Sequence, residues 1–285
     1  MLLRCSALLA CAGLWLAAGH ARAAESYDNC MGFIDSVPAT ISTQGTWCLR
    51  KDLSTAMASG AAVTVATNNV TLDCNDFKLG GLQAGAGTLT DGILANSRAN
   101  ITVRHCNVRG FYQGVFLGGD AGGHLVEDNR VEGSTRTGIH VAGDSSLVRG
   151  NLVRDTGRST YERNNAYGIT TSASVDVLDN IVDGVLPYGN SSGNGSAFGI
   201  RTGVNAGGRI HRNAVRGTVG LGTGGAYGIY NAVSGRIQLR DNDLVGGGGP
   251  GYGLYCGNDD GRALGNSING FSNAIVGCRD DGNSL

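Results

Sequence analysis

The feature that most constrains this chain is a short unit that recurs along most of its length. Each copy is centred on one position, with an apolar residue three positions before it and another two positions after it. That position is Asn75, Asn129, Asn151, Asn180, Asn213, Asn242 and Asn266, and Cys106 in one further copy. Four residues later most copies have a glycine, with Leu79 and Asp155 as the exceptions. Successive copies are 22 to 33 residues apart.

A second column marks the other half of the unit. It is a glycine followed by an aliphatic residue, at Gly92, Gly114, Gly138, Gly168, Gly199, Gly228 and Gly253, with Ala274 in a degenerate last copy. The pattern has no helical period, and one such unit cannot bury its own apolar face. The sequence therefore predicts stacked repeats that share one continuous core.

The apolar positions divide each unit into three short strands. The first contains the glycine pair, and the turn between the second and third is centred on asparagine. Asparagine tolerates a left-handed backbone, and its amide can hydrogen bond to the asparagine of the next repeat. All variation in length lies between the third strand and the next glycine, where we expect long loops to stack into a wall: 80–91, 156–167, 185–198 and 218–227.

The two columns, N-x-[VIL]-x-G and G-[IV], extend over about residues 62–278 and resemble those of a known family. The family is the right-handed parallel β-helix proteins of the pectate-lyase-like superfamily. The resemblance implies an all-β solenoid of about eight to nine coils over residues 62–285, behind an entry and capping segment at 24–61. In the enzymes of that superfamily the substrate lies on the outer face of the first strand. The same coil also serves non-catalytic proteins, so the resemblance indicates a fold rather than an activity.

Residues 1–23 have the pattern of a signal peptide. Arg4 supplies the positive end, Ala7 to Ala18 the apolar core, and Ala21-Arg22-Ala23 the cleavage site. No later stretch is long enough to span a membrane. We therefore expect a secreted or periplasmic protein.

Six cysteines follow the signal peptide, and an even number in an exported chain favours disulfides. Among the fifteen possible pairings, the spacing of the repeats favours bonds between neighbouring coils and within the entry segment. The predicted pairs are Cys74–Cys106, Cys256–Cys278 and Cys30–Cys48. None of these cysteines has the spacing of a zinc site, and we expect neither a metal nor another cofactor.

The charge of the chain narrows the classes of partner. A net charge of −1 argues against binding to nucleic acid or to an anionic membrane surface. Of the 22 basic residues, 20 are arginines, whose planar guanidinium suits carboxylates. An extracellular acidic polysaccharide therefore remains a compatible partner.

The candidate site lies on the first strand, where the residue after the inward aliphatic points outward. These outward residues are Leu94, Phe116, His140, Thr170, Arg201, Tyr230 and Tyr255. The loops beside them carry Tyr161, Glu162, Arg163 and Tyr188. Sugar rings stack on aromatic faces and arginine pairs with uronate carboxylates, so we predict that a polysaccharide binds here. The alternative is an ordinary solvated sheet face.

His140 and Arg201 are the candidate catalytic residues, two coils and roughly 10 Å apart. Histidine is chosen for proton transfer because its unperturbed pKa lies near neutral pH. No two carboxylates share a column, and the paired-aspartate and calcium-binding motifs of the superfamily are missing, so no catalytic residue is transferred from it. An enzyme of this kind would be a polysaccharide lyase, an epimerase or a glycoside hydrolase. The alternative is a non-catalytic surface or adhesion module.

A second set of aromatic residues directly precedes the glycines. Its members are Tyr167, Phe198, Tyr227 and Tyr252. We expect these rings to form a stacked corner that packs under the loops.

Overall fold

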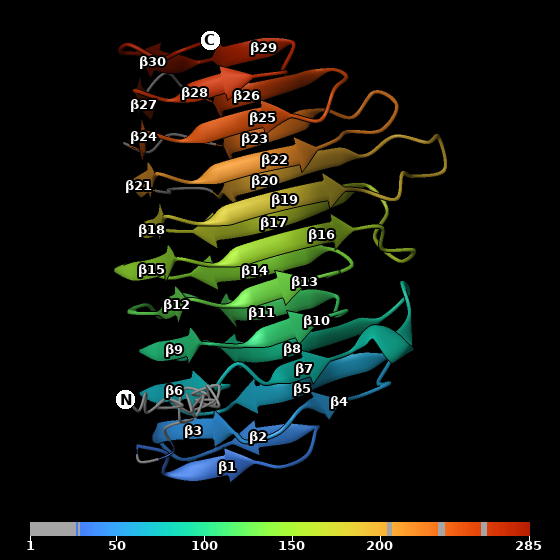
Figure 1. The fold of residues 1–285 in the computed structure, drawn as a ribbon, viewed down its shortest axis with the longest axis vertical. Helices are drawn as coiled ribbons and strands as arrows, with labels where there is room; N and C mark the ends of the chain where they lie inside the picture. The colour runs from blue at the N-terminus through green and yellow to red at the C-terminus, as the bar shows by residue number, and fades with distance from the viewer. Residues whose placement is uncertain (1–26, 28, 204–206, 233–236, 258–260) are drawn as a thin grey trace, which may run out of the picture.

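The computed structural model describes residues 27, 29–203, 207–232, 237–257 and 261–285. Over these residues the chain winds into a parallel β-helix whose coils stack along one long axis (Figure 1). A complete coil contributes one strand to each of three sheets, which have eleven, nine and ten described strands, and the strands within each sheet pair in parallel. The fold expected from the repeat is therefore confirmed.

The sheets are named here by their number of strands. The eleven-stranded sheet contains β1 (Gly32–Ile34), β3 (Gly45–Leu49), β6 (Val70–Asp73), β9 (Ile101–Arg104), β12 (Leu125–Glu127), β15 (Ser146–Arg149), β18 (Val175–Leu178), β21 (Gly208–His211), β24 (Ile237–Arg240), β27 (Gly261–Leu264) and β30 (Cys278–Asp280). The nine-stranded sheet contains β4 (Leu53–Ser54), β7 (Lys78–Gly80), β10 (Asn107–Arg109), β13 (Arg130–Glu132), β16 (Leu152–Gly157), β19 (Ile181–Leu186), β22 (Ala214–Thr218), β25 (Asp243–Gly246) and β28 (Ser267–Asn269). The ten-stranded sheet contains β2 (Ala39–Ile41), β5 (Ser59–Val65), β8 (Leu89–Asn96), β11 (Gln113–Gly118), β14 (Thr137–Ala142), β17 (Asn165–Ser172), β20 (Ser196–Thr202), β23 (Ala226–Asn231), β26 (Gly251–Cys256) and β29 (Asn273–Val276).

The segment before residue 62 contributes to the same three sheets. Its strands β1 to β4 pair in parallel with β3, β5, β6 and β7. The stack of coils therefore includes the segment that the sequence assigned to entry and capping, at the blue end of the ribbon in Figure 1.

The glycine column lies where neighbouring coils approach most closely. A Cβ atom built on Gly168 would lie 2.5 Å from the carbonyl oxygen of Gly199 and 2.4 Å from Cγ1 of Val182. The next residue, Ile169, points inward and is fully buried, in line with Ile139 and Ile200 of the adjacent coils. The glycine is thus required by steric contact, and the aliphatic residue after it forms the core.

The asparagine column forms a hydrogen-bonded ladder at the corner between the eleven- and nine-stranded sheets. In each coil from Asn129 to Asn266 the side-chain amide donates to the side-chain oxygen of the asparagine in the next coil, over 2.7–3.0 Å. The ladder ends at Asn283, which the repeat had not revealed. The predicted amide ladder is therefore confirmed, and its members from Asn129 to Asn266 are almost completely buried.

The prediction that these asparagines take the left-handed backbone is wrong for all of them except Asn75. The positive φ angle belongs to the preceding residue, as at Asp179 (58°) and Arg212 (54°). The reason is geometric: the residue that reverses the chain points outward into water, whereas the asparagine after it points inward to reach its neighbours. Most coils also have a glycine four residues after the asparagine, and Asp155, one of the two exceptions at that position, still adopts the left-handed conformation, with φ of 52°.

The long connections all lie at the corner between the nine- and ten-stranded sheets, as the sequence predicts. They follow β7, β16, β19 and β22 and project from the side of the stack opposite the eleven-stranded sheet (Figure 1). The first of them includes the short 3-10 helix η1 (Leu82–Ala84). The variable part of every coil therefore borders the start of the ten-stranded sheet.

Three disulfides join Cys30 to Cys48, Cys74 to Cys106 and Cys256 to Cys278, which confirms all three predicted pairs. Disulfides are typical of an oxidising environment outside the cytosol. Among the described residues no helix has the length and apolar character needed to cross a membrane. The predicted signal peptide, residues 1–23, lies outside the described residues.

Candidate functional site

The outward residues predicted on the first strand form a continuous column on the ten-stranded sheet. Phe116 pairs with Leu94 on one side and His140 on the other, and the column continues through Thr170 and Arg201. It ends with Tyr230 and Tyr255. We call these seven residues the outer column.

Stacking between neighbouring coils occupies the ring faces in the outer column. The rings of Tyr230 and Tyr255 are parallel to within 5°, with centroids 4.9 Å apart, and Phe116 stacks on His140 at 4.7 Å. Sugar rings therefore cannot stack between the two tyrosines, contrary to the role expected for them. Neither of their hydroxyl groups hydrogen bonds to another described residue. The column offers hydrogen-bonding groups rather than a flat platform.

A second column runs beside the first and contains one stacked group in each of six successive coils. Its members are Tyr112, Arg136, Tyr167, Phe198, Tyr227 and Tyr252. The aromatic rings from Tyr167 onward stack at 4.8–5.2 Å, as expected from the sequence. On the N-terminal side of these rings, the guanidinium of Arg136 lies 5.5 Å from the ring of Tyr112 and 5.8 Å from that of Tyr167. We call this set the stacked column.

Sequence reasoning missed Tyr112 and Arg136. Both lie two residues before the glycine of their coil, whereas the other members lie one residue before it. The available signal was an aromatic or arginine residue within two positions of the glycine in six consecutive coils. A strict single-position column could not detect it.

The two columns contact each other through ring edges. Tyr230 meets Phe198 at 5.2 Å and Tyr227 at 4.9 Å, in both cases nearly perpendicular. Arg201, which pairs with Tyr230 from the preceding coil, likewise contacts two rings of the stacked column. Its guanidinium carbon lies 5.5 Å from the ring centre of Tyr167 and 6.0 Å from that of Phe198. Cation–π contacts of this kind hold a guanidinium in place without neutralising its charge.

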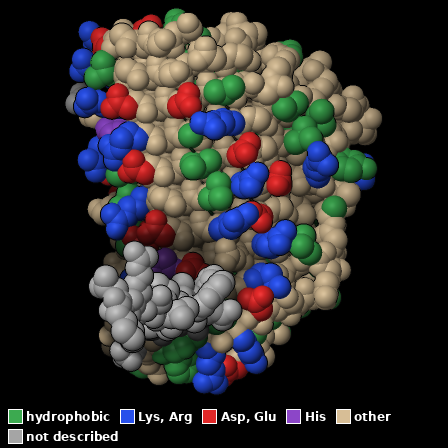
Figure 2. Space-filling view, in the orientation of Figure 1, with side chains coloured by type: hydrophobic (Ala, Val, Ile, Leu, Met, Phe, Trp, Pro, Cys, Tyr) green, Lys and Arg blue, Asp and Glu red, His purple; other side chains and the backbone are tan. Residues whose placement is uncertain are grey.

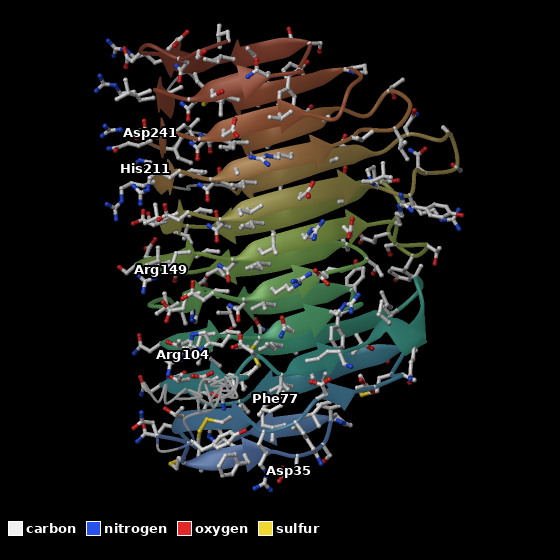
Figure 3. All side chains as sticks on the ribbon, in the orientation of Figure 1. Asp35, Phe77, Arg104, Arg149, His211 and Asp241 are labelled. Carbon is white, nitrogen blue, oxygen red and sulfur yellow. A yellow bond between two sulfur atoms is a disulfide. The ribbon has the colours of Figure 1, made fainter. Side chains whose placement is uncertain are left out.

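Arg201 differs from most other arginines in lacking an acidic partner among the described residues. On the eleven-stranded side Arg104 pairs with Asp73 at 2.8 Å and Arg149 with Glu127 at 2.6 Å. Figure 3 shows Arg104 and Arg149 along that edge, and Figure 2 shows basic and acidic side chains interspersed over the visible face. The positive charge of Arg201 is therefore available on a sheet face rather than part of an ion pair.

The loop residues predicted for the site divide into two groups. Glu162 reaches the sheet, where its carboxylate lies 2.8 Å from Nη2 of Arg136. Arg163 instead lies over the ring of Tyr188 in the next loop, at 5.1 Å. Tyr161 and Tyr188 are 65% and 50% exposed. Between these loops lies a pocket of about 450 Å³, lined by Tyr161, Glu162, Arg163, Asn164, Asn190 and Ser191.

Burial shifts the pKa values of three groups at the N-terminal end of this face. Burial, with the positive charges of Arg136 and Arg201, lowers the pKa of His140 to about 4. Burial also raises the pKa of Asp91 to about 6, although a hydrogen bond from Gln113 at 3.3 Å opposes the shift. The pKa of Tyr112 rises to about 12, mainly because of burial.

These shifts change the chemistry expected of His140. With a pKa of about 4 its imidazole is mostly neutral at pH 7, which favours accepting a proton over donating one. The unperturbed pKa on which it was chosen does not apply at this position. Asp91, which the sequence analysis did not select, has a pKa closer to neutral pH, at about 6.

The arrangement brings His140, Thr170 and Arg201 into one column and places Glu162 beside it through Arg136. Tyr161, Arg163 and Tyr188 stay out on the loops. Within the described residues no three His, Cys, Asp or Glu side chains are grouped so that they could hold a metal ion. The face can therefore offer a neutral imidazole, hydroxyl groups and guanidinium groups to a ligand.

Comparison with known proteins identifies the class that this fold defines. The family model described as "Right handed beta helix region" matches residues 54–197 and, in a second overlapping match, 91–284. The chain therefore belongs to the right-handed β-helix family. No curated protein and no solved structure matches the chain significantly.

Proposed function

We propose that this β-helix protein binds an extracellular acidic polysaccharide along the outer face of its ten-stranded sheet. The observation that carries the proposal is Arg201, a guanidinium without an ion-pair partner in the described chain, held against Tyr167 and Phe198. A uronate carboxylate is the natural counterpart of such a group. The secretion expected from the signal peptide would bring the protein to such polymers.

The spacing of the face supports the same ligand. Groups in the two columns repeat once per coil, at roughly 4.8 Å, which is close to the length of one sugar unit. The hydroxyl groups at the ring edges of Tyr230 and Tyr255 can hydrogen bond to sugar hydroxyls. A polysaccharide lying along the helix axis would thus meet one polar group in each coil.

The experiment is a binding screen by isothermal titration calorimetry with polygalacturonate, alginate and hyaluronate, with dextran as a neutral polymer. We expect one of the uronate polymers to bind and Arg201→Ala to weaken it about tenfold, the effect of losing one charge-assisted contact. Arg216→Ala is the matched control, because that arginine lies on the nine-stranded sheet and pairs with Asp243. Equal losses in the two variants, or no binding of any uronate polymer, would refute the proposal.

The same screen tests whether a bound polymer is also processed. Lysis by elimination would give an unsaturated product that absorbs in the ultraviolet, and hydrolysis would release reducing ends. Because the pKa of His140 lies at about 4, Asp91 is the group to substitute first if either product forms.

A second candidate function is a non-catalytic surface or adhesion module. The observation that favours it is the pair of exposed rings, Tyr161 and Tyr188, on neighbouring loops. Exposed tyrosines are common at protein interfaces. Adhesion that survives Arg201→Ala but is lost on replacing both loop tyrosines with serine would support this candidate over the first.

A further inference from the structure

Two guanidinium groups from different coils contact the single ring of Tyr167. Arg136, just before β14, lies 5.8 Å from the ring centre, and Arg201, near the end of β20, lies 5.5 Å from it. Arg201 also contacts Phe198, the ring stacked on Tyr167. Arg136 approaches this ring from the preceding coil and Arg201 from the following coil, so two positive charges are held against one ring. An anion that reaches both guanidinium groups at the outer edge of the ring would relieve their repulsion.

His140 lies close to both arginines. It pairs with Thr170, which in turn pairs with Arg201, and its other side stacks on Phe116. The positive charges of Arg136 and Arg201 both act to lower its pKa, so the imidazole reports the local potential. An anion bound between the arginines would shift that pKa upward.

Arg136 is only partly satisfied by the chain itself. The carboxylate of Glu162 contacts Nη2 at 2.8 Å, whereas Nε is buried and has no hydrogen-bond partner in the structure. Glu162 is nearly half exposed. Its own backbone N–H bonds within the loop, to the hydroxyl of Ser159, whereas Thr160 and Arg163 on either side bond to Ala86 and Gly189 of other loops. A guanidinium can donate two parallel hydrogen bonds to one carboxylate, and here the N–H of Nε is not used.

We propose that Arg136 and Arg201 form a subsite for one carboxylate, and that Glu162 occupies part of it when no ligand is bound. The inference rests on the proposed function, since it names the place where an acidic sugar chain would be fixed in register. It also assigns a role to the loop: the ligand carboxylate competes with Glu162, and binding releases the loop from Arg136.

The test uses sodium glucuronate as a single-carboxylate probe and the imidazole of His140 as the reporter. The proton resonance of His140, assigned by its loss in His140→Gln, is titrated with pH at constant ionic strength, with glucuronate, glucose or sodium chloride present. We expect saturating glucuronate to raise the pKa of His140 by about one unit, as an added negative charge nearby would. Glucose and chloride should leave it unchanged.

Three variants separate the roles of the side chains. Arg136→Gln and Arg201→Gln should each raise the pKa of His140 without ligand and weaken glucuronate about tenfold, the loss expected for one charge-assisted pair. Glu162→Gln should instead strengthen glucuronate several-fold, because the internal competitor is removed. Arg216→Gln serves as the control, and melting temperatures show that each variant is folded.

The outcomes distinguish this inference from the proposed function. Glucuronate binding at His140 without binding of any uronate polymer would retain the subsite and refute the polysaccharide proposal. Polymer binding that Arg136→Gln leaves unchanged would refute the subsite and retain the proposal. A pKa of His140 that glucuronate does not move, or a Glu162→Gln variant that binds glucuronate more weakly, would overturn the inference.

Discussion

Two corners of the coil follow opposite rules. At the corner between the eleven- and nine-stranded sheets, each asparagine is buried and bonds to the coils before and after it, as Asn180 does with Asn151 and Asn213. At the corner between the nine- and ten-stranded sheets, connections range from short turns to long loops. The first corner fixes the spacing of the coils, and the second is free to vary without disturbing it.

The difference indicates where function can be built on a solenoid. A turn whose backbone and side chain both belong to a buried network cannot accept insertions, since each residue has a partner in the next coil. The loops make their contacts largely with each other and with the start of the ten-stranded sheet, as Arg163 does with Tyr188 and Glu162 with Arg136. Residues that recognise a ligand can therefore change on this side alone.

The largest effect is expected from breaking the asparagine ladder. Asn180→Ala removes the bonds from Nδ2 to Val148 and Asn213 and leaves the backbone N–H of Asn151 without its acceptor. With several buried polar groups unsatisfied, we expect a loss of about 4 kcal/mol in the free energy of unfolding, measured with urea. Asn190→Ala, in a loop, is the matched control and should cost less than about 1 kcal/mol. Equal costs would contradict the contrast between the corners.

A smaller effect on stability should come from the protonation of His140 in acid. The folded pKa of His140, about 4, lies below its usual value of 6.5, so the folded state binds fewer protons than the unfolded state between these pH values. Stability is then highest above about pH 6.5 and falls as the pH drops toward 4. His140→Phe, which keeps the stack on Phe116, should remove about 2 kcal/mol of this decline in urea titrations at pH 7 and pH 4. An unchanged decline would show that the histidine does not respond as its burial implies.

Asp91 should give the folding stability the opposite dependence on pH. Its folded pKa, about 6, lies above the usual 3.8, so its contribution to stability is greatest below about pH 4 and is lost as the pH rises through 6. Asp91→Asn should therefore stabilise the protein by about 1–2 kcal/mol at pH 7 and change little at pH 4. Thermal melts at the two pH values measure this difference, and stabilisation that is the same at both would contradict the assignment.

The smallest effect should come from lengthening a loop. Inserting Gly-Ser-Gly-Ser after Gly248 doubles the four-residue connection between β25 and β26 and should cost only the entropy of a longer connection, about 0.6 kcal/mol. A single glycine inserted after Asp179 would instead move Asn180 out of the ladder. The free energies of unfolding of the two variants, measured by urea titration, should differ by several kcal/mol, and similar values would show that both corners tolerate insertion.

The sequence revealed the parts of the fold that each coil repeats. Steric contact between coils requires glycine at positions such as Gly168, and the buried ladder requires asparagine at positions such as Asn180, so both left a periodic record. The left-handed position before the asparagine left no periodic record, because Asp, Arg, His and Gly all occupy it and each of them can lie exposed to water there. Its assignment to asparagine was wrong for that reason.

The candidate face was predictable only in part. Alternation placed His140, Thr170 and Arg201 correctly on one outward column. It could not show that the rings of Tyr230 and Tyr255 cover each other, because that depends on ring tilt rather than on position. The contact of Glu162 with Arg136 depends on how a loop folds back, and no period in the sequence encodes it.

The asparagine ladder also gives the molecule an electrical polarity. From Asn129 to Asn266 each side-chain NH2 donates one hydrogen to the asparagine oxygen of the next coil and the other to a backbone carbonyl of the preceding coil. Every side-chain oxygen in the row, by contrast, accepts from the N-terminal side, so the side-chain carbonyl dipoles add rather than cancel. The partially positive end falls at Asn283, whose amide donates to the carboxylate of Asp280. The negative end accepts the backbone N–H of Cys106, beside the Cys74–Cys106 disulfide. In this respect the row of amides resembles a helix macrodipole built from side chains, with an acidic group neutralising its positive pole.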